Sequence, residues 1–176
     1  MSEQAGRYQR SAGGMVGAMV VLVVLLVAWV GIQSLVKSQP DSAVHAVDYA
    51  KVVAPARKAA KFDLVAPTSL PRGWRATSVS FSDTVPQHWH LGVLTADDRY
   101  VGLEQGQASP SSMLEKYVDA NAQRGAPVTV EGRRWSTYTD AGGDLALVRR
   151  DGGATTLVVG HAVPKAALVS YTAGLS

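Results

Sequence analysis

Cysteine is missing from all 176 positions of the sequence. Without it the chain forms no disulfide bonds, so any folded domain must be held together by its core alone. The absence also excludes a cysteine nucleophile and a lipid attached through an N-terminal cysteine. A membrane attachment would therefore have to be made by the polypeptide itself.

Recognised catalytic motifs are missing as well. The chain has no G-x-S-x-G elbow to present a serine nucleophile, no phosphate-binding G-x-x-x-x-G-K loop and no H-E-x-x-H pair of metal ligands. Internal repeats and low-complexity tracts are absent too. These absences predict a protein that is not an enzyme and that carries no cofactor.

Charged residues of the two signs are nearly balanced. The chain has 17 Lys and Arg against 14 Asp and Glu, for a formal net charge of +3. A nucleic-acid-binding surface needs basic residues concentrated on one face, and we expect no nucleic acid among the partners of this chain. Hydrophobic residues make up 47% of the sequence, which is typical of a folded domain rather than a disordered one.

The most conspicuous feature that is present is residues 11–36, a run without a charged side chain. About 20 helical residues, at about 1.5 Å each, cross a hydrocarbon core of about 30 Å. A cleaved signal peptide is the alternative, but its apolar region is about 7–15 residues long and ends in small residues. Trp29 and Ile32 occupy the place where those small residues would stand. We therefore predict a retained transmembrane helix that places the chain in a lipid bilayer.

The flanks of this run predict its orientation. Arg7 and Arg10 precede it, and Lys37 follows it. By the positive-inside rule, residues 1–10 stay in the cytoplasm and the remainder is exported from it. Trp29 suits the outer interface between membrane and water. Together these four residues form the predicted membrane-interface set of a single-pass cell-membrane protein.

Residues 37–61 are predicted to form a juxtamembrane linker followed by a helix. Polar residues around Pro40 indicate an exposed linker, and the Ala- and Val-rich residues 47–61 favour a helix. Pro55 falls inside this helix and is expected to interrupt it. The basic side chains of this helix either touch anionic lipid head groups or form an ordinary solvated face.

Residues 62–176 are predicted to form an extracytoplasmic α+β domain. Its strands are expected at 62–65, 75–82, 89–95, 100–107, 128–130, 133–139, 144–150 and 155–160. One helix is expected to start at Ser109 and Pro110 and to end near Gly125, and a short helix is expected at 165–173. The strands should form an antiparallel sheet of about six or seven strands with the helices packed against it. A two-sheet sandwich is the alternative.

A hairpin is predicted where two strands meet at Asp97 and Asp98. If these two residues form the turn, Leu91 lies opposite Glu104 on the neighbouring strand. By the same register, Trp89 and Val93 lie opposite glycines, where a large side chain can lie across bare backbone.

The other face of this hairpin is predicted to gather polar side chains at its open end. They are His88, His90, Gln105 and Gln107. The His-x-His spacing puts both imidazoles on one side of a strand, as some zinc sites require. In this register Glu104 points to the opposite face, so a third ligand is missing and no metal site is expected. The cluster remains the candidate ligand-binding site.

Five segments also resemble a known family. They are LPRGWR at 70–75, WHLG at 89–92, YVGLEQ at 100–105, GRRW at 132–135 and TTLVVG at 155–160. In this order the chain resembles a family of actinobacterial single-pass membrane proteins with an exported domain of unknown function. The resemblance implies a retained anchor and an exported domain. It implies no activity, cofactor or catalytic residue.

The sequence as a whole therefore predicts a membrane-anchored extracytoplasmic domain that binds a partner or plays a structural role at the cell envelope. The partner would be an envelope protein that the sequence does not identify. The alternative is a domain that senses a small ligand or a metal through His88, His90 and Gln105. A third possibility is an envelope hydrolase whose site follows none of the motifs above.

Overall fold

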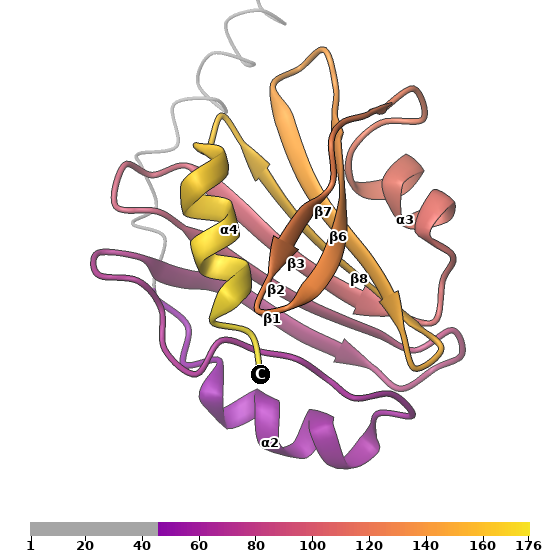
Figure 1. The fold of residues 1–176 in the computed structure, drawn as a ribbon. Helices are drawn as coiled ribbons and strands as arrows, with labels where there is room; N and C mark the ends of the chain where they lie inside the picture. Colours follow the sequence, from indigo (N-terminus) through magenta and orange to yellow (C-terminus); the bar gives the residue numbers. More distant parts are fainter. Residues whose placement is uncertain (1–45) are drawn as a thin grey trace, which may run out of the picture. The chain divides into compact units, whose positions relative to one another are not determined.

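The computed structural model describes residues 46–176 (Figure 1). The predicted cytoplasmic tail, the apolar run at 11–36 and the interface residues Arg7, Arg10, Trp29 and Lys37 lie outside the described residues. No helix within residues 46–176 is long and apolar enough to cross a membrane. The transmembrane helix therefore stays a prediction from the sequence.

Residues 46–176 form one antiparallel sheet with three helices against it. The elements in chain order are α2 (Ala50–Ala59), β1 (Arg75–Ser82), β2 (His88–Leu94), β3 (Tyr100–Gly106), α3 (Pro110–Tyr117), β4 (Gln123–Arg124), β5 (Val128–Val130), β6 (Arg133–Thr139), β7 (Asp144–Asp151), β8 (Ala154–His161) and α4 (Lys165–Ala173). The strand order is β1-β2-β3-β8-β7-β6-β4, with β5 paired to β6. The α+β prediction is confirmed, whereas the sandwich is wrong because these strands share one 8-stranded sheet.

Helix α3 begins as its sequence predicts and ends early. The Ser109 side chain accepts a hydrogen bond from the Ser112 backbone N–H, and Pro110 occupies the first turn. The helix ends at Tyr117 rather than near Gly125. Beyond it the Asp119 carboxylate accepts the backbone N–H of the residue two positions on, which favours a turn over another helical turn. The chain then pairs with β6 as the short strand β4.

The predicted first strand at 62–65 is wrong. This segment pairs with no strand of the described residues 46–176, although the apolar side chain of Leu64 is buried in the core. Its backbone bonds go elsewhere: the Val65 N–H donates to the Gln105 side chain, and the Ala66 N–H donates to the Ser176 carbonyl. Alternation in this segment therefore reflects burial against the sheet, not membership of it.

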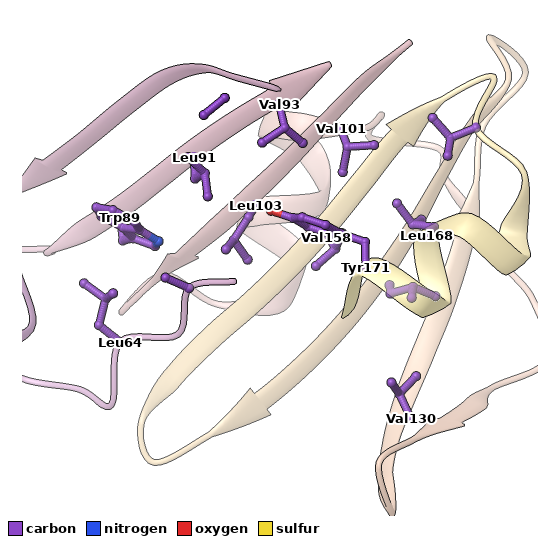
Figure 2. Close-up of a cluster of buried hydrophobic side chains, with 14 of the residues drawn as sticks. Leu64, Trp89, Leu91, Val93, Val101, Leu103, Val130, Val158, Leu168 and Tyr171 are labelled. Atoms are coloured by element: carbon purple, nitrogen blue, oxygen red, sulfur yellow. The ribbon is translucent and has the colours of Figure 1, made fainter. Parts of the chain in front are cut away.

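The main core lies on one face of the sheet, beneath α4, α2 and the segment before β1. Figure 2 shows the side chains of β2 and β3 lining this face, with those of α4 near β8. Its fully buried large members include Trp89, Leu91, Val93, Val101, Leu103, Leu147, Val158 and Leu168. Each such burial contributes about 1.5–3 kcal/mol of transfer free energy, so this face supplies most of the stability.

A smaller core lies on the opposite face. Met113 and Leu114 of α3 pack there against Ala146, Val148, Leu157 and Val159 of β7 and β8. These two strands are thus apolar on both faces, as their sequences predict. Helix α3 packs its apolar side chains on the β7–β8 half of this face. The β1–β3 half carries polar side chains instead.

Candidate functional site

The register of the hairpin between β2 and β3 decides which side chains meet. His90 pairs with Glu104, and Leu91 pairs with Leu103. The predicted register, with Leu91 opposite Glu104, is wrong by one residue. A shift of one residue sends every side chain of a strand to the other face relative to its partner.

The turn chemistry explains this shift. The Thr95 hydroxyl accepts hydrogen bonds from the backbone N–H groups of Asp97 and Arg99. Asp98 adopts a left-handed conformation with φ 58°. The loop therefore runs from Thr95 to Arg99, and Thr95 belongs to the turn rather than to the strand.

Two of the predicted ligand-binding residues leave the site in this register. Gln105 lies opposite Trp89, on the main-core face. There its amide donates to the Asp63 carbonyl and accepts the Val65 N–H, each at 2.9 Å. Gln107 accepts the backbone N–H of Gln87 at 3.0 Å. Both glutamine side chains hold backbone segments in place, so the predicted four-residue cluster is corrected to its two histidines.

Glu104, rather than Gln105 or Gln107, lies beside the two histidines. Its side chain lies on the same face as His88 and His90, where the sequence reasoning excluded it. We call this surface the polar face and define it as Ser78, Ser80, Ser82, His88, His90, Tyr100 and Glu104. It belongs to β1, β2 and β3.

A continuous hydrogen-bonded chain crosses three strands on the polar face. The Ser78 hydroxyl in β1 lies 2.8 Å from Nε2 of His90 in β2. Nδ1 of the same imidazole lies 2.6 Å from Oε1 of Glu104 in β3. Glu104 is only 3% exposed, whereas the His90 side chain is 22% exposed. The order is thus a half-buried hydroxyl, an imidazole and a buried carboxylate.

His88 connects the same carboxylate to α3. Its Nε2 lies 2.9 Å from Oε2 of Glu104 and 3.0 Å from the Tyr117 hydroxyl. The two rings stack with centroids 5.6 Å apart. Oε2 is buried without a well-directed hydrogen bond, because the His88 contact is close but poorly aligned. The Lys116 ammonium lies 4.8 Å from the centre of the Tyr117 ring and adds a positive charge at this rim.

The surroundings keep Glu104 ionised. Burial alone would raise the pKa of this carboxyl, but the close contacts of His88 and His90, and the charge of these imidazoles when protonated, lower it below its ordinary 4.5. Burial, together with the charge of Glu104, raises the pKa of the Tyr100 hydroxyl to about 12. The face therefore combines a carboxylate that only accepts hydrogen bonds with a phenol that keeps its proton.

Tyr100 lies across bare backbone. A Cβ at Gly92 would meet its ring and hydroxyl at 3.1 Å, and a Cβ at Gly102 would meet the same hydroxyl at 3.1 Å. Trp89 and Val93 were expected to lie across glycines, but they face Gln105 and Val101. The pattern of an aromatic ring over cross-strand glycines is therefore present, but on the polar face.

A small cavity adjoins the polar face at α3. It measures about 110 Å³ and is lined by residues that include Gln87, His88, Met113, Lys116 and Tyr117. A larger hollow of about 470 Å³ lies beside α2, lined by residues that include Arg57, Pro67 and Ser176. That hollow is lined by no histidine or carboxylate side chain. Another hollow of about 240 Å³, beside Gln105, is lined by residues that include Asp63, Arg133, Arg149 and Asp151. The cavity that adjoins the polar face is the small one at α3.

No group of three His, Asp or Glu side chains within residues 46–176 is arranged to hold a metal ion. Glu104 is the third acidic or imidazole group that the sequence reasoning lacked, yet its Oε1 is already taken by His90 at 2.6 Å. The arrangement can serve as a proton relay when Nε2 of His90 is the unprotonated ring nitrogen. The imidazole can accept a proton from Ser78 while the carboxylate fixes its orientation.

One comparison with known proteins is positive. The family model described as "Protein of unknown function (DUF4245)" matches residues 7–169. The chain belongs to this family. The polar face lies within the segment that DUF4245 covers, and the expected resemblance to an uncharacterised family is confirmed. No curated protein matches the chain.

In this DUF4245 protein, the polar face and its rim include residues that the sequence did not assign to a site. Ser78 was expected only as part of a strand, and Tyr117 only as an apolar residue of a helix. Ser78, Ser80 and Ser82 alternate with Val79 and Phe81 along β1, so a polar face was encoded in the period-two pattern. The residues opposite these serines are set by the pairing of β1 with β2. The sequence of one strand does not determine that pairing.

Proposed function

We propose that this protein is a single-pass membrane protein whose domain outside the cytoplasm binds a ligand or protein partner of the cell envelope through its polar face. The proposed anchor is supported by the uncharged run at 11–36 and by Arg7 and Arg10 before it. The binding role is supported by the geometry around Glu104, and the two parts of the proposal are tested separately.

The observation that carries the binding role is a buried carboxylate beneath an open polar surface. Glu104 is 3% exposed and contacts both His88 and His90. Burying such charges costs desolvation free energy, and a well-packed apolar set of the same volume is often as stable or more so. Shifted ionisable groups gather at functional sites for this reason. A fold that needed only stability would extend the apolar surface of β7 and β8 across these strands.

The kind of ligand follows from the groups that the face presents. Hydroxyls of β1 and Tyr100 donate and accept hydrogen bonds, and the Lys116 ammonium stands at the rim beside Tyr117. The adjoining cavity of about 110 Å³ admits a small group rather than a whole cofactor. We therefore expect a neutral or weakly acidic polar ligand, or a protein segment that places one such group there.

A second candidate is a sensing domain, favoured by the contact between His88 and Tyr117. This contact links the polar face to α3, so a small ligand at the histidines would alter how the helix is held. Titration calorimetry of the full chain in detergent, with zinc as the probe and His90→Ala as the control, separates sensing of metal from binding of other partners. Tight binding that the variant loses would favour a metal sensor.

The anchor is tested by the location of the C-terminus. A tag fused behind Ser176 should react with a membrane-impermeant reagent on intact cells. A cytoplasmic protein labelled only after lysis is the control. A tag that stays protected until the cells are opened would contradict the proposed topology.

The binding face is tested by site-specific crosslinking in living cells. A photo-crosslinking amino acid at Ser80, which is exposed on the polar face, should capture a discrete species. The same amino acid at Glu131, exposed in the turn between β5 and β6, is the control and should not capture it. Equal capture at both positions would contradict binding at the polar face.

A further inference from the structure

Ser78, His90 and Glu104 stand in the order that serine hydrolases use to activate a hydroxyl. Ser78 Oγ lies 2.8 Å from Nε2 of the imidazole, and the carboxylate lies 2.6 Å from its Nδ1. Such a relay is recognised by geometry and by the role of each group, not by position in the sequence. A serine within a strand has no G-x-S-x-G elbow, so the missing motif does not argue against this one.

The carboxylate dictates the tautomer of the imidazole. An ionised Glu104 only accepts hydrogen bonds, so the proton of a neutral His90 sits on Nδ1 and points at it. Nε2 is then left with its lone pair facing the Ser78 hydroxyl. A hydroxyl that donates to such a nitrogen loses its proton as it attacks, which is the action of a general base.

The Ser78 hydroxyl occupies space that Gly92 leaves free by having no side chain. A Cβ on Gly92 would stand 2.4 Å from Ser78 Oγ, closer than any real contact. The same Cβ would lie 3.1 Å from the Tyr100 hydroxyl, so the serine and the phenol both pack over the backbone of Gly92. Because the pKa of Tyr100 is raised to about 12, this donor keeps its proton and can stabilise a developing oxyanion.

We propose that Ser78 is a nucleophile that takes the acyl group of an ester, with His90 as general base, Glu104 as its positioning residue and Tyr100 as oxyanion donor. These residues lie on the polar face, so the inference rests on the proposed function only in placing the activity at the same surface. Failure of the chemistry leaves the crosslinking test of binding unaffected.

The reaction balances with water as the only second reactant. Ser78 Oγ forms a bond to the carbonyl carbon while its proton passes to Nε2 of His90. The bond to the leaving oxygen breaks, and the alcohol departs with that proton, which leaves an acyl-serine. Water then attacks the acyl carbon and gives a proton to His90. This proton returns to Ser78 Oγ as the carboxylic acid leaves.

The test uses covalent labelling of the purified full chain in detergent. Diisopropyl fluorophosphate reacts with activated serines, forming a bond from phosphorus to Oγ and releasing hydrogen fluoride. Intact-mass and peptide mass spectrometry should find one adduct per chain, located at Ser78. Labelling should disappear in Ser78→Ala and slow at least tenfold in His90→Gln, because the general base is lost. Ser170→Ala, which replaces an exposed serine of α4 away from the polar face, is the control and should label as the parent does.

Hydrolysis of p-nitrophenyl acetate supplies a second measurement with the same variants. Turnover should be lost in Ser78→Ala and retained in Ser170→Ala. Circular dichroism confirms that each variant is folded. The proposal is overturned if Ser78 labels no faster than Ser170, or if folded His90→Gln labels and hydrolyses at the parent rate.

Discussion

His90 lies directly opposite Glu104 across β2 and β3, and the two side chains meet at 2.6 Å on the face of the sheet away from Trp89. The hydrogen bond joins an imidazole to a carboxylate that is 3% exposed. Bonds to a charged group are about twice as strong as neutral ones, and more so where water is excluded. This pair fixes the orientation of the His90 ring, and with it the position of Nε2, the ring nitrogen that contacts Ser78.

Replacing Glu104 should destabilise the domain in a pH-dependent way. Glu104→Gln removes the charged acceptor of two histidines and should cost about 1–3 kcal/mol in the free energy of unfolding at pH 7. The pKa of Glu104 is lowered in the folded chain, so its stabilisation is present above the ordinary pKa of 4.5 and is lost as the pH falls through the lowered value. Urea unfolding of the full chain measures both quantities.

The difference between parent and Glu104→Gln should therefore shrink as the pH falls from 7 towards 3. Glu115→Gln, exposed on α3, is the control and should change stability by less than about 0.5 kcal/mol. A difference for Glu104→Gln that stays constant over this range would show that the carboxylate is not stabilised by its histidines.

Adding a methyl group at Gly92 should clash with Ser78. The Cβ would stand 2.4 Å from the Ser78 hydroxyl and 3.1 Å from the Tyr100 ring, so Gly92→Ala should lose about 1–3 kcal/mol of stability. Ser78→Ala removes the closer of the two contacts. A double-mutant cycle by urea unfolding should therefore give a favourable coupling energy of at least about 0.5 kcal/mol. Additive effects would mean that the two side chains do not compete for this space.

Removing the Gln105 side chain should loosen a specific backbone segment. Gln105→Ala leaves the Val65 N–H and the Asp63 carbonyl without their partner and should cost about 1–3 kcal/mol. Hydrogen exchange at the Val65 amide should accelerate before that of the central strands. Gln107→Ala, which loses a single bond to the Gln87 backbone, is the control and should leave the Val65 amide unchanged. Unaltered exchange at Val65 in Gln105→Ala would refute this role.

Removing the hydroxyl of Tyr171 should not weaken the domain. Tyr171 is 2% exposed and its ring stacks on Trp74 with centroids 5.5 Å apart, but its buried hydroxyl has no hydrogen-bond partner among residues 46–176. An unpaired buried hydroxyl costs free energy, so Tyr171→Phe should be neutral or raise stability by up to about 1 kcal/mol. Tyr171→Ala should lose about 3–5 kcal/mol. A clear drop in melting temperature for Tyr171→Phe would reveal a partner for the hydroxyl.

Local chemistry was enough to predict most elements of this domain. Alternation and turn residues located β1, β2, β3 and the strands of the C-terminal meander, and Ser109 with Pro110 located the start of α3. Apolar residues on both faces of β8 correctly indicated a strand covered from both sides. Each of these signals depends on residues close together in the chain, so a single sequence is enough to predict the elements.

The candidate site was harder to predict because it depends on pairing between strands. Counting Thr95 as part of the strand placed Glu104 on the wrong face and Gln105 in the site. The Thr95 hydroxyl and the left-handed Asp98 lengthen the turn through bonds that composition alone does not specify. Ser78 reaches His90 across a register irregularity in β1, between Ala76 and Ser78, which the sequence pattern does not indicate.

The most direct test of the account is nitrogen-15 NMR of the His90 imidazole in the full chain at neutral pH. The account predicts a proton on Nδ1, shifted downfield and slow to exchange, and an Nε2 that accepts from Ser78. In Glu104→Gln the downfield proton should disappear, while Ser80→Ala leaves it unchanged. A His90 that carries its proton on Nε2 in the parent chain would contradict the relay from Ser78 to Glu104.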